Sequence, residues 1–79
     1  MNKIMYLDLD NMGAQLKEIR ESENLTRKAI SMDAHVSHSF ICRVERGRGI
    51  MKLDTLMNWT RALGYTEVRI RVCRTERTN

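Results

Sequence analysis

The chain has 79 residues, of which 42% are apolar and 30% are charged, with 14 Lys and Arg against 10 Asp and Glu. A chain this short forms one small domain and buries only about 60% of its unfolded surface, so its hydrophobic core is small. The longest uncharged stretch, residues 34–42, is far shorter than the roughly 18 apolar residues of a membrane span, and no secretory signal is visible. We therefore expect a cytoplasmic protein that has no association with a membrane.

Positive charge is concentrated from the middle of the chain onward. Residues 1–26 contain three Lys and Arg against five Asp and Glu, whereas residues 27–48 contain five against two and residues 49–79 contain six against three. Clustered Lys and Arg are typical of proteins that bind a polyanion, most often a nucleic acid. Because the net charge is only +4, specificity on a nucleic acid is expected to depend on a few base contacts rather than on bulk attraction.

The beginning of the chain is predicted to form an arm or strand and then a helix. Residues 4–9 are compatible with a strand, although an early helical turn fits equally well, and residues 1–11 are interpreted as an N-terminal arm or strand. A helix is predicted over residues 12–22, with Asn11 as its N-cap. Its apolar residues recur at i, i+4 and i+7, the spacing of one helical face: Met12, Leu16 and Ile19.

Two short helices follow, each preceded by a residue that can cap its first turn. Thr26 precedes a helix predicted over residues 27–33, and Ser37 precedes a helix predicted over residues 38–46. The hydroxyl of either residue can accept a hydrogen bond from the unpaired N–H groups of the first turn. Since only residues 34–36 separate the second helix from the cap of the third, the pattern indicates a helix-turn-helix.

The last third of the chain is predicted to change from helix to strand. After a loop at residues 47–51, a fourth helix is expected to end at Gly64. Its apolar side is formed by Leu53, Leu56, Met57 and Leu63. Residues 66–73 then alternate with period two and are rich in β-branched residues, which predicts a strand. A single strand is not stable alone, so it needs a partner within the chain or from a second copy. Residues 75–79 are expected to be a disordered tail.

Several short motifs mark the starts and ends of the predicted helices. They are Leu25-Thr26, Val36-Ser37, Val44-Glu45-Arg46-Gly47, Leu53-Asp54-Thr55-Leu56 and Ala62-Leu63-Gly64. Together they resemble the lambda-repressor-like (Cro/C1, XRE-type) family over about residues 12–65. The resemblance implies a mainly helical helix-turn-helix DNA-binding domain of four to five helices. Many relatives dimerise through a fifth helix, whereas residues 66–74 here are expected to form a strand that pairs across a dimer.

The resemblance also implies roles for individual side chains on double-stranded DNA. The helix over residues 38–46 is expected to enter the major groove and read bases. The expected readers are Ser37, His38, Ser39, Cys42 and Arg43. Arg43 can bind guanine O6 and N7 together, whereas Cys42 can touch a thymine methyl or a sugar. The expected ligands of the DNA backbone are Arg27, Lys28, Arg46 and Arg48. Phe40 is either a buried anchor or an apolar contact in the groove.

Three further residues are assigned structural roles by the resemblance. Relatives often pair an arginine of the first helix with a glutamate near the end of the recognition helix, which implies a structural ion pair between Arg20 and Glu45. Relatives usually have glycine at the turn between the two motif helices, because the backbone there needs a positive φ. His35 occupies this position, and histidine tolerates a positive φ better than most residues.

Metal binding and catalysis are not expected. His35, His38 and Cys42 have a spacing compatible with metal ligands, but no fourth ligand is evident nearby, and a turn histidine with two groove-facing residues explains them better. The two cysteines, Cys42 and Cys73, are not expected to form a disulfide in the cytoplasm. The sequence shows no nucleophile–base–acid set and no glycine-rich phosphate loop, so we expect no enzyme, no metal and no cofactor.

These observations predict a transcriptional regulator that binds a palindromic operator as a homodimer and acts as a repressor or autorepressor. Dimerisation is expected through an intermolecular β-ribbon formed by Val68, Ile70 and Val72. The alternative is an antitoxin of the HipB-like or HigA-like branch, which would also bind and neutralise a toxin protein. The sequence leaves the choice between these two functions open.

Overall fold

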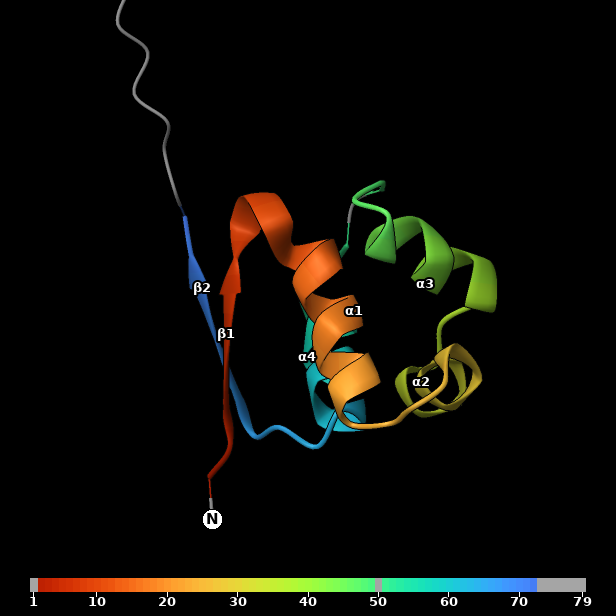
Figure 1. Ribbon diagram of the computed structural model, residues 1–79, viewed down its shortest axis with the longest axis horizontal. Helices are drawn as coiled ribbons and strands as arrows, with labels where there is room; N and C mark the ends of the chain where they lie inside the picture. The colour runs from red at the N-terminus through yellow and green to blue at the C-terminus, as the bar shows by residue number, and fades with distance from the viewer. Residues whose placement is uncertain (1, 50, 73–79) are drawn as a thin grey trace, which may run out of the picture.

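The fold is a small helical domain with a two-stranded sheet along one side (Figure 1). The computed structural model describes residues 2–49 and 51–72. Its elements in chain order are β1 (Ile4–Asp8), a 3-10 turn (Leu9–Asn11), α1 (Met12–Ser22), α2 (Arg27–Ala34), α3 (His38–Glu45), α4 (Leu53–Ala62) and β2 (Glu67–Arg71). The expected mainly helical fold is confirmed. Within the described residues, no helix has the length and apolarity needed to cross a membrane.

Each predicted capping residue lies directly before the first residue of its helix, and two of the three make a capping hydrogen bond. The Thr26 hydroxyl accepts a hydrogen bond from the Ala29 amide at 3.1 Å, and the Ser37 hydroxyl accepts one from the Phe40 amide at 3.1 Å. Asn11 holds the predicted N-cap position directly before α1, but its side chain makes no capping hydrogen bond. The 3-10 turn runs directly into α1, so α1 continues from an existing helical turn.

The strand β2 finds its partner within the chain. It pairs in parallel with β1, in a register that places Met5 opposite Val68 and Leu7 opposite Ile70 (Figure 1). This pairing corrects the expectation that residues 66–74 find their partner strand across a dimer, because the partner observed is β1 of the same chain. Val68, one of the three expected dimer residues, packs against the core instead, whereas contacts of Ile70 and Val72 with a second copy stay a prediction. A parallel pair requires a long connection, and here the four helices provide it. Val72 lies just beyond the end of β2, and the predicted tail at residues 75–79 lies outside the described residues.

The core lies between the helices and the inner face of the sheet. Met5 and Leu7 of β1 point inward and are almost fully buried, and Val68 of β2 packs against them from the same face. The helices contribute the side chains that are completely buried: Leu16, Ile30, Ile41 and Trp59. The sheet therefore closes one side of the helical core, and β1 supplies a part of the core that the sequence did not assign with certainty.

The glycine at position 13 allows α1 and α3 to approach each other closely. A Cβ atom built on Gly13 would lie 1.8 Å from the carbonyl oxygen of Val44, at the last turn of α3. Any larger residue would have to push the two backbones apart. The contact fixes the end of α3 against the start of α1.

Candidate nucleic-acid interface

The turn between α2 and α3 sets the direction of α3. His35 ends α2 in the left-handed conformation with φ of 58°, as its place in the motif predicts. The amides of His35 and Val36 both donate hydrogen bonds to the Ser31 carbonyl, and the Ser31 hydroxyl donates back to the Val36 carbonyl. These bonds hold the turn in one conformation, so α3 leaves it with a fixed orientation.

One face of α3 is buried and the other is accessible to a partner. Ile41 and Val44 point into the core. The residues expected to read bases lie on the other side of the helix and are exposed, except for the half-buried Cys42: Ser37, His38, Ser39, Cys42 and Arg43. The fold therefore gathers all five on a single surface, which we call the α3 face.

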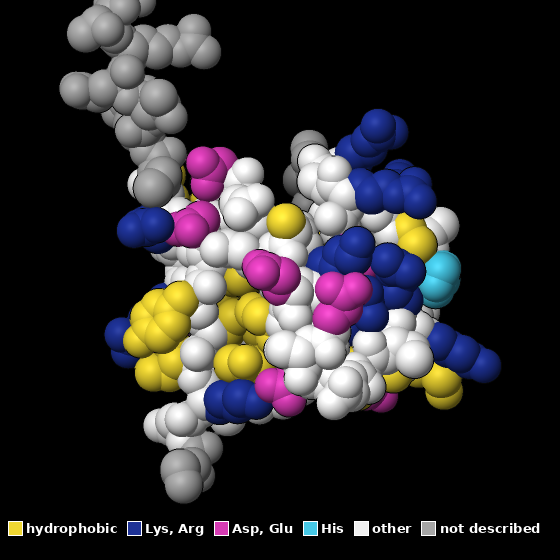
Figure 2. Space-filling view, in the orientation of Figure 1, with side chains coloured by type: hydrophobic (Ala, Val, Ile, Leu, Met, Phe, Trp, Pro, Cys, Tyr) yellow, Lys and Arg dark blue, Asp and Glu magenta, His cyan; other side chains and the backbone are white. Residues whose placement is uncertain are grey.

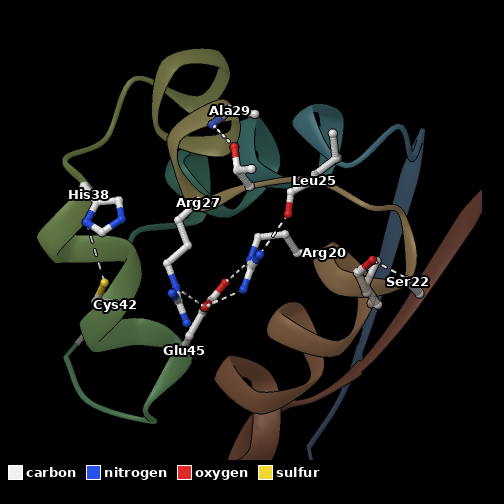
Figure 3. A network of polar contacts seen from close by, with 10 residues as sticks. Arg20, Ser22, Leu25, Arg27, Ala29, His38, Cys42 and Glu45 are labelled. Atoms are coloured by element: carbon white, nitrogen blue, oxygen red, sulfur yellow. Dashed lines mark hydrogen bonds and ion pairs between the residues drawn. The ribbon is translucent and has the colours of Figure 1, made fainter.

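Two polar contacts order the side chains of the α3 face. The hydroxyl oxygens of Ser37 and Ser39 lie 3.3 Å apart, and His38 Nδ1 lies 3.7 Å from the sulfur of Cys42 (Figure 3). Ser37 Oγ accepts the capping bond from the Phe40 amide, which leaves its hydroxyl hydrogen and a second lone pair for Ser39 or for a ligand. The α3 face thus presents hydroxyl, imidazole, thiol and guanidinium groups, which suit the polar edges of bases.

Basic side chains surround this face. Lys28, Arg43, Arg46 and Arg48 are exposed, and they come from α2, from α3 and from the loop after it. Figure 2 shows Lys and Arg side chains gathered on the side of the molecule that carries α2 and α3. An arrangement of this kind, with polar readers inside a basic rim, is typical of proteins that contact both bases and phosphates.

Arg27 belongs to a buried ion-pair network at the end of α3 (Figure 3). Glu45 is the centre of the network, and only 2% of its side chain is exposed. Arg20 donates from Nε to Glu45 Oε2 at 2.7 Å and from Nη2 to Oε1 at 3.3 Å. Arg27 donates from Nε to Oε1 at 2.9 Å, and this hydrogen bond raises the pKa of the Arg27 guanidinium.

The network adds a structural contact to Arg27, whose expected contact with the DNA backbone stays a prediction. The sequence assigned this residue to the DNA backbone and missed its bond to Glu45. A carboxylate has enough lone pairs to accept from two arginines, but the sequence does not show that both guanidiniums approach the same group. Arg20 also donates from Nη1 to the Leu25 carbonyl at 2.8 Å, so the network joins α1, the start of α2 and the end of α3.

A groove of about 360 Å³ runs between the first turns of α3 and α4. Six residues line it: Val36, Ser37, Phe40, Arg43, Lys52 and Thr55. Phe40 is half-buried and packs against the core, and it also lines this groove of the protein surface; its contact with the groove of DNA stays a prediction. Lys52 and Thr55 were missed because their place beside α3 depends on how α4 packs.

The described residues contain no group of three or more His, Cys, Asp or Glu side chains that could hold a metal ion. His38 and Cys42 are neighbours on α3, whereas His35 lies in the turn. Cys42 is a free thiol, and its possible partner Cys73 lies outside the part of the chain that the structure describes.

Comparison with known proteins identifies the family. A profile described as a helix-turn-helix domain matches residues 11–72. The restriction-modification controller protein C.AhdI from Aeromonas hydrophila is 24% identical and has a TM-score of 0.69, over 73% of this chain and 88% of that chain. The clp gene regulator ClgR from C. glutamicum is 26% identical and has a TM-score of 0.68, over 72% of this chain and 73% of that chain. A search of the curated proteins finds no match.

The matched residues include all four described helices and make up more than half of the chain. The resemblance to the Cro/C1-type helix-turn-helix proteins is therefore confirmed, whereas the HipB-like branch stays a prediction. The chain belongs to the helix-turn-helix domain family.

Proposed function

We propose that the protein is a transcriptional regulator that binds a palindromic operator as a homodimer and represses transcription by covering it. The observation that carries the proposal is the α3 face, where five polar side chains lie together on the exposed side of a helix with a fixed orientation. Membership of the helix-turn-helix family supports DNA binding, and the basic rim supplies the contacts to phosphate.

The α3 face is proposed to read bases, and the basic side chains around it are proposed to bind the DNA backbone. Arg43 is exposed one turn after the start of α3, and its guanidinium can bind guanine O6 and N7 in the major groove. Arg46 and Arg48 follow at the end of α3 and in the next loop, and they are proposed to bind phosphate together with Lys28. Lys52 joins this group, because it lines the same groove as Arg43.

The test begins with an operator identified by footprinting the DNA upstream of the gene. Arg43→Ala is expected to cost about 1–3 kcal/mol on the operator and to relax its sequence preference. Arg48→Ala is expected to weaken binding to the operator and to random DNA equally, and to lower the salt dependence. Arg61→Ala is the control, because Arg61 is exposed beside β2 rather than on the α3 face. If Arg43→Ala lowers the affinity for the operator and for random DNA equally, Arg43 binds phosphate rather than a base.

The homodimer is proposed to form at the edge of β2 that β1 does not occupy. The N–H and C=O groups along the edge of a strand can pair with a second copy of the same strand. Ile70 and Val72 are exposed by 36% and 68%, so β2 extends beyond the core that covers Val68. Because β2 already pairs with β1, the proposed ribbon between two copies would extend the sheet rather than create it.

A pair of equally exposed apolar residues tests this interface. Val72 and Leu53 are both 68% exposed, but Val72 follows β2 whereas Leu53 begins α4. Val72→Asp is expected to convert dimers to monomers in light scattering, and Leu53→Asp is expected to leave them dimeric. If Leu53→Asp is monomeric and Val72→Asp stays dimeric, the interface lies on α4 rather than on β2. Truncation after Tyr65 is less informative, because it would also remove Val68, which packs beside Met5, and could therefore destabilise the core.

A further inference from the structure

The ring of Phe40 is the one aromatic group beside the described readers of the α3 face. It lines the groove between α3 and α4 together with Val36, and these two side chains form its apolar part. The remaining lining groups are the hydroxyls of Ser37 and Thr55 and the cations of the other two residues. A groove with an apolar floor and a polar, cationic rim suits a ligand that carries an apolar group next to phosphates and base edges.

The distance between Arg43 and Phe40 indicates where this apolar part would lie relative to a base that Arg43 binds. Its guanidinium carbon lies 5.8 Å from the centre of the Phe40 ring, within the range of a cation–π contact. Successive base pairs are about 3.4 Å apart along a strand. The 5.8 Å separation is about one or two base-pair steps, so when Arg43 binds a guanine we expect the ring to lie near a neighbouring base pair.

The major-groove edges of the four bases offer one large apolar group, the C5-methyl of thymine, which 5-methylcytosine shares. We propose that Phe40, with Val36, binds the C5-methyl group of a pyrimidine next to the guanine that Arg43 reads. This proposal rests on the proposed function, because it assumes that α3 lies in the major groove. Within it, Phe40 is a specificity-determining residue, and the preferred site contains a methylated pyrimidine beside a guanine.

The first experiment changes the DNA and leaves the protein intact. In the footprinted operator, each thymine is replaced in turn by deoxyuridine, which removes only the methyl group. One position per half-site, next to a guanine, is expected to weaken binding about fourfold, which is the effect of about 0.8 kcal/mol for one buried methyl-sized group. At that position, 5-methylcytosine binding more tightly than cytosine shows that either source of the methyl is accepted, whereas equal binding restricts the site to thymine.

The second experiment assigns the effect to a side chain. The ratio of affinities for thymine and deoxyuridine operators is expected to fall to about one in Phe40→Ala and to stay near fourfold in Cys42→Ala. Both affinities in a ratio are measured on the same protein, so an unfolded fraction lowers both equally and does not change the ratio. Phe40→Leu is a second variant, in which an apolar side chain still fills the core. A ratio that falls in Cys42→Ala instead would overturn the proposal, because it would place the methyl group against Cys42, on the α3 face, rather than in the groove that Phe40 and Val36 line.

The same measurements separate this proposal from the proposed function. If the protein binds its operator specifically, but replacing the thymines beside guanines with deoxyuridine does not weaken binding, the methyl site is refuted and the proposed function is not. Equal affinity for operator and random DNA would refute the proposed function itself.

Discussion

Arg20→Met is expected to lower the free energy of unfolding by about 3–5 kcal/mol, the usual cost of removing one partner of a buried ion pair. The side chain of Arg20 is 8% exposed, and it donates two hydrogen bonds to Glu45 and one to the Leu25 carbonyl. Its loss leaves the buried carboxylate with Arg27 as its remaining guanidinium partner.

The matched control is Arg27→Met, which removes the other arginine of the network. The side chain of Arg27 is 37% exposed and donates one hydrogen bond to Glu45, so water screens much of its charge. Its replacement leaves Glu45 held by both bonds from Arg20, and the expected cost is no more than about 1 kcal/mol. Burial and the number of bonds therefore predict a difference of about 2–4 kcal/mol between two arginines that share one carboxylate.

Urea denaturation measures this difference. Trp59 is the only tryptophan and is fully buried, so its fluorescence reports the loss of the core. With a denaturant dependence near 1 kcal/mol per molar urea, the midpoint of Arg20→Met is expected about 2–4 M below that of Arg27→Met. A domain of this size is stable by roughly 4–12 kcal/mol, so Arg20→Met can be partly unfolded without denaturant. Equal midpoints would refute the claim that Arg20 and Glu45 are the energetic centre of the network.

Three further outcomes follow from single residues. Gly13→Ala is expected to cost more than about 2 kcal/mol in thermal or urea unfolding, because its Cβ would collide with the Val44 carbonyl; an unchanged midpoint would contradict this. His35→Gly is expected to stabilise the fold by up to about 1 kcal/mol, since glycine adopts the left-handed conformation without strain, and a lower melting temperature would argue against it. The hydrogen bond from Arg71 lowers the pKa of Asp8, so its stabilising effect is present above the unfolded pKa near 3.9 and is lost as the pH falls through the folded value. An NMR titration of Arg71→Gln should show a higher pKa for Asp8, and an unchanged value would exclude Arg71 as the main cause.

The helix-turn-helix could be predicted because its signals are local. Thr26 and Ser37 cap helices through bonds to residues three positions later, and the left-handed turn at His35 depends on its immediate neighbours. Contacts between distant segments were harder to predict. Alternation of residues near Val68 predicted a strand, but the partner was expected to be a second copy, whereas the observed partner is β1 at the other end of the same chain.

The same distinction applies to the candidate site. The residues of the α3 face could be chosen from the resemblance to the family, which assigns roles to positions along one helix and needs no knowledge of how that helix packs. The bond from Arg27 to Glu45 and the placing of Lys52 beside Phe40 depend on how helices pack against one another. Gly13 shows the same limit, since a single glycine gives no sign in the sequence that another backbone passes against it.

The strand pair has a consequence for how the chain folds. Lys3 and Thr66, like Asp8 and Arg71, are hydrogen-bonded across 63 positions, whereas the turns and caps of the helices join near neighbours. Contacts between distant residues form slowly, because the chain must first lose the entropy of closing a long loop. The helical part can therefore assemble early, and the sheet joins last. The surface proposed for the second copy would then exist only on molecules that have finished folding, so assembly would select complete domains over intermediates.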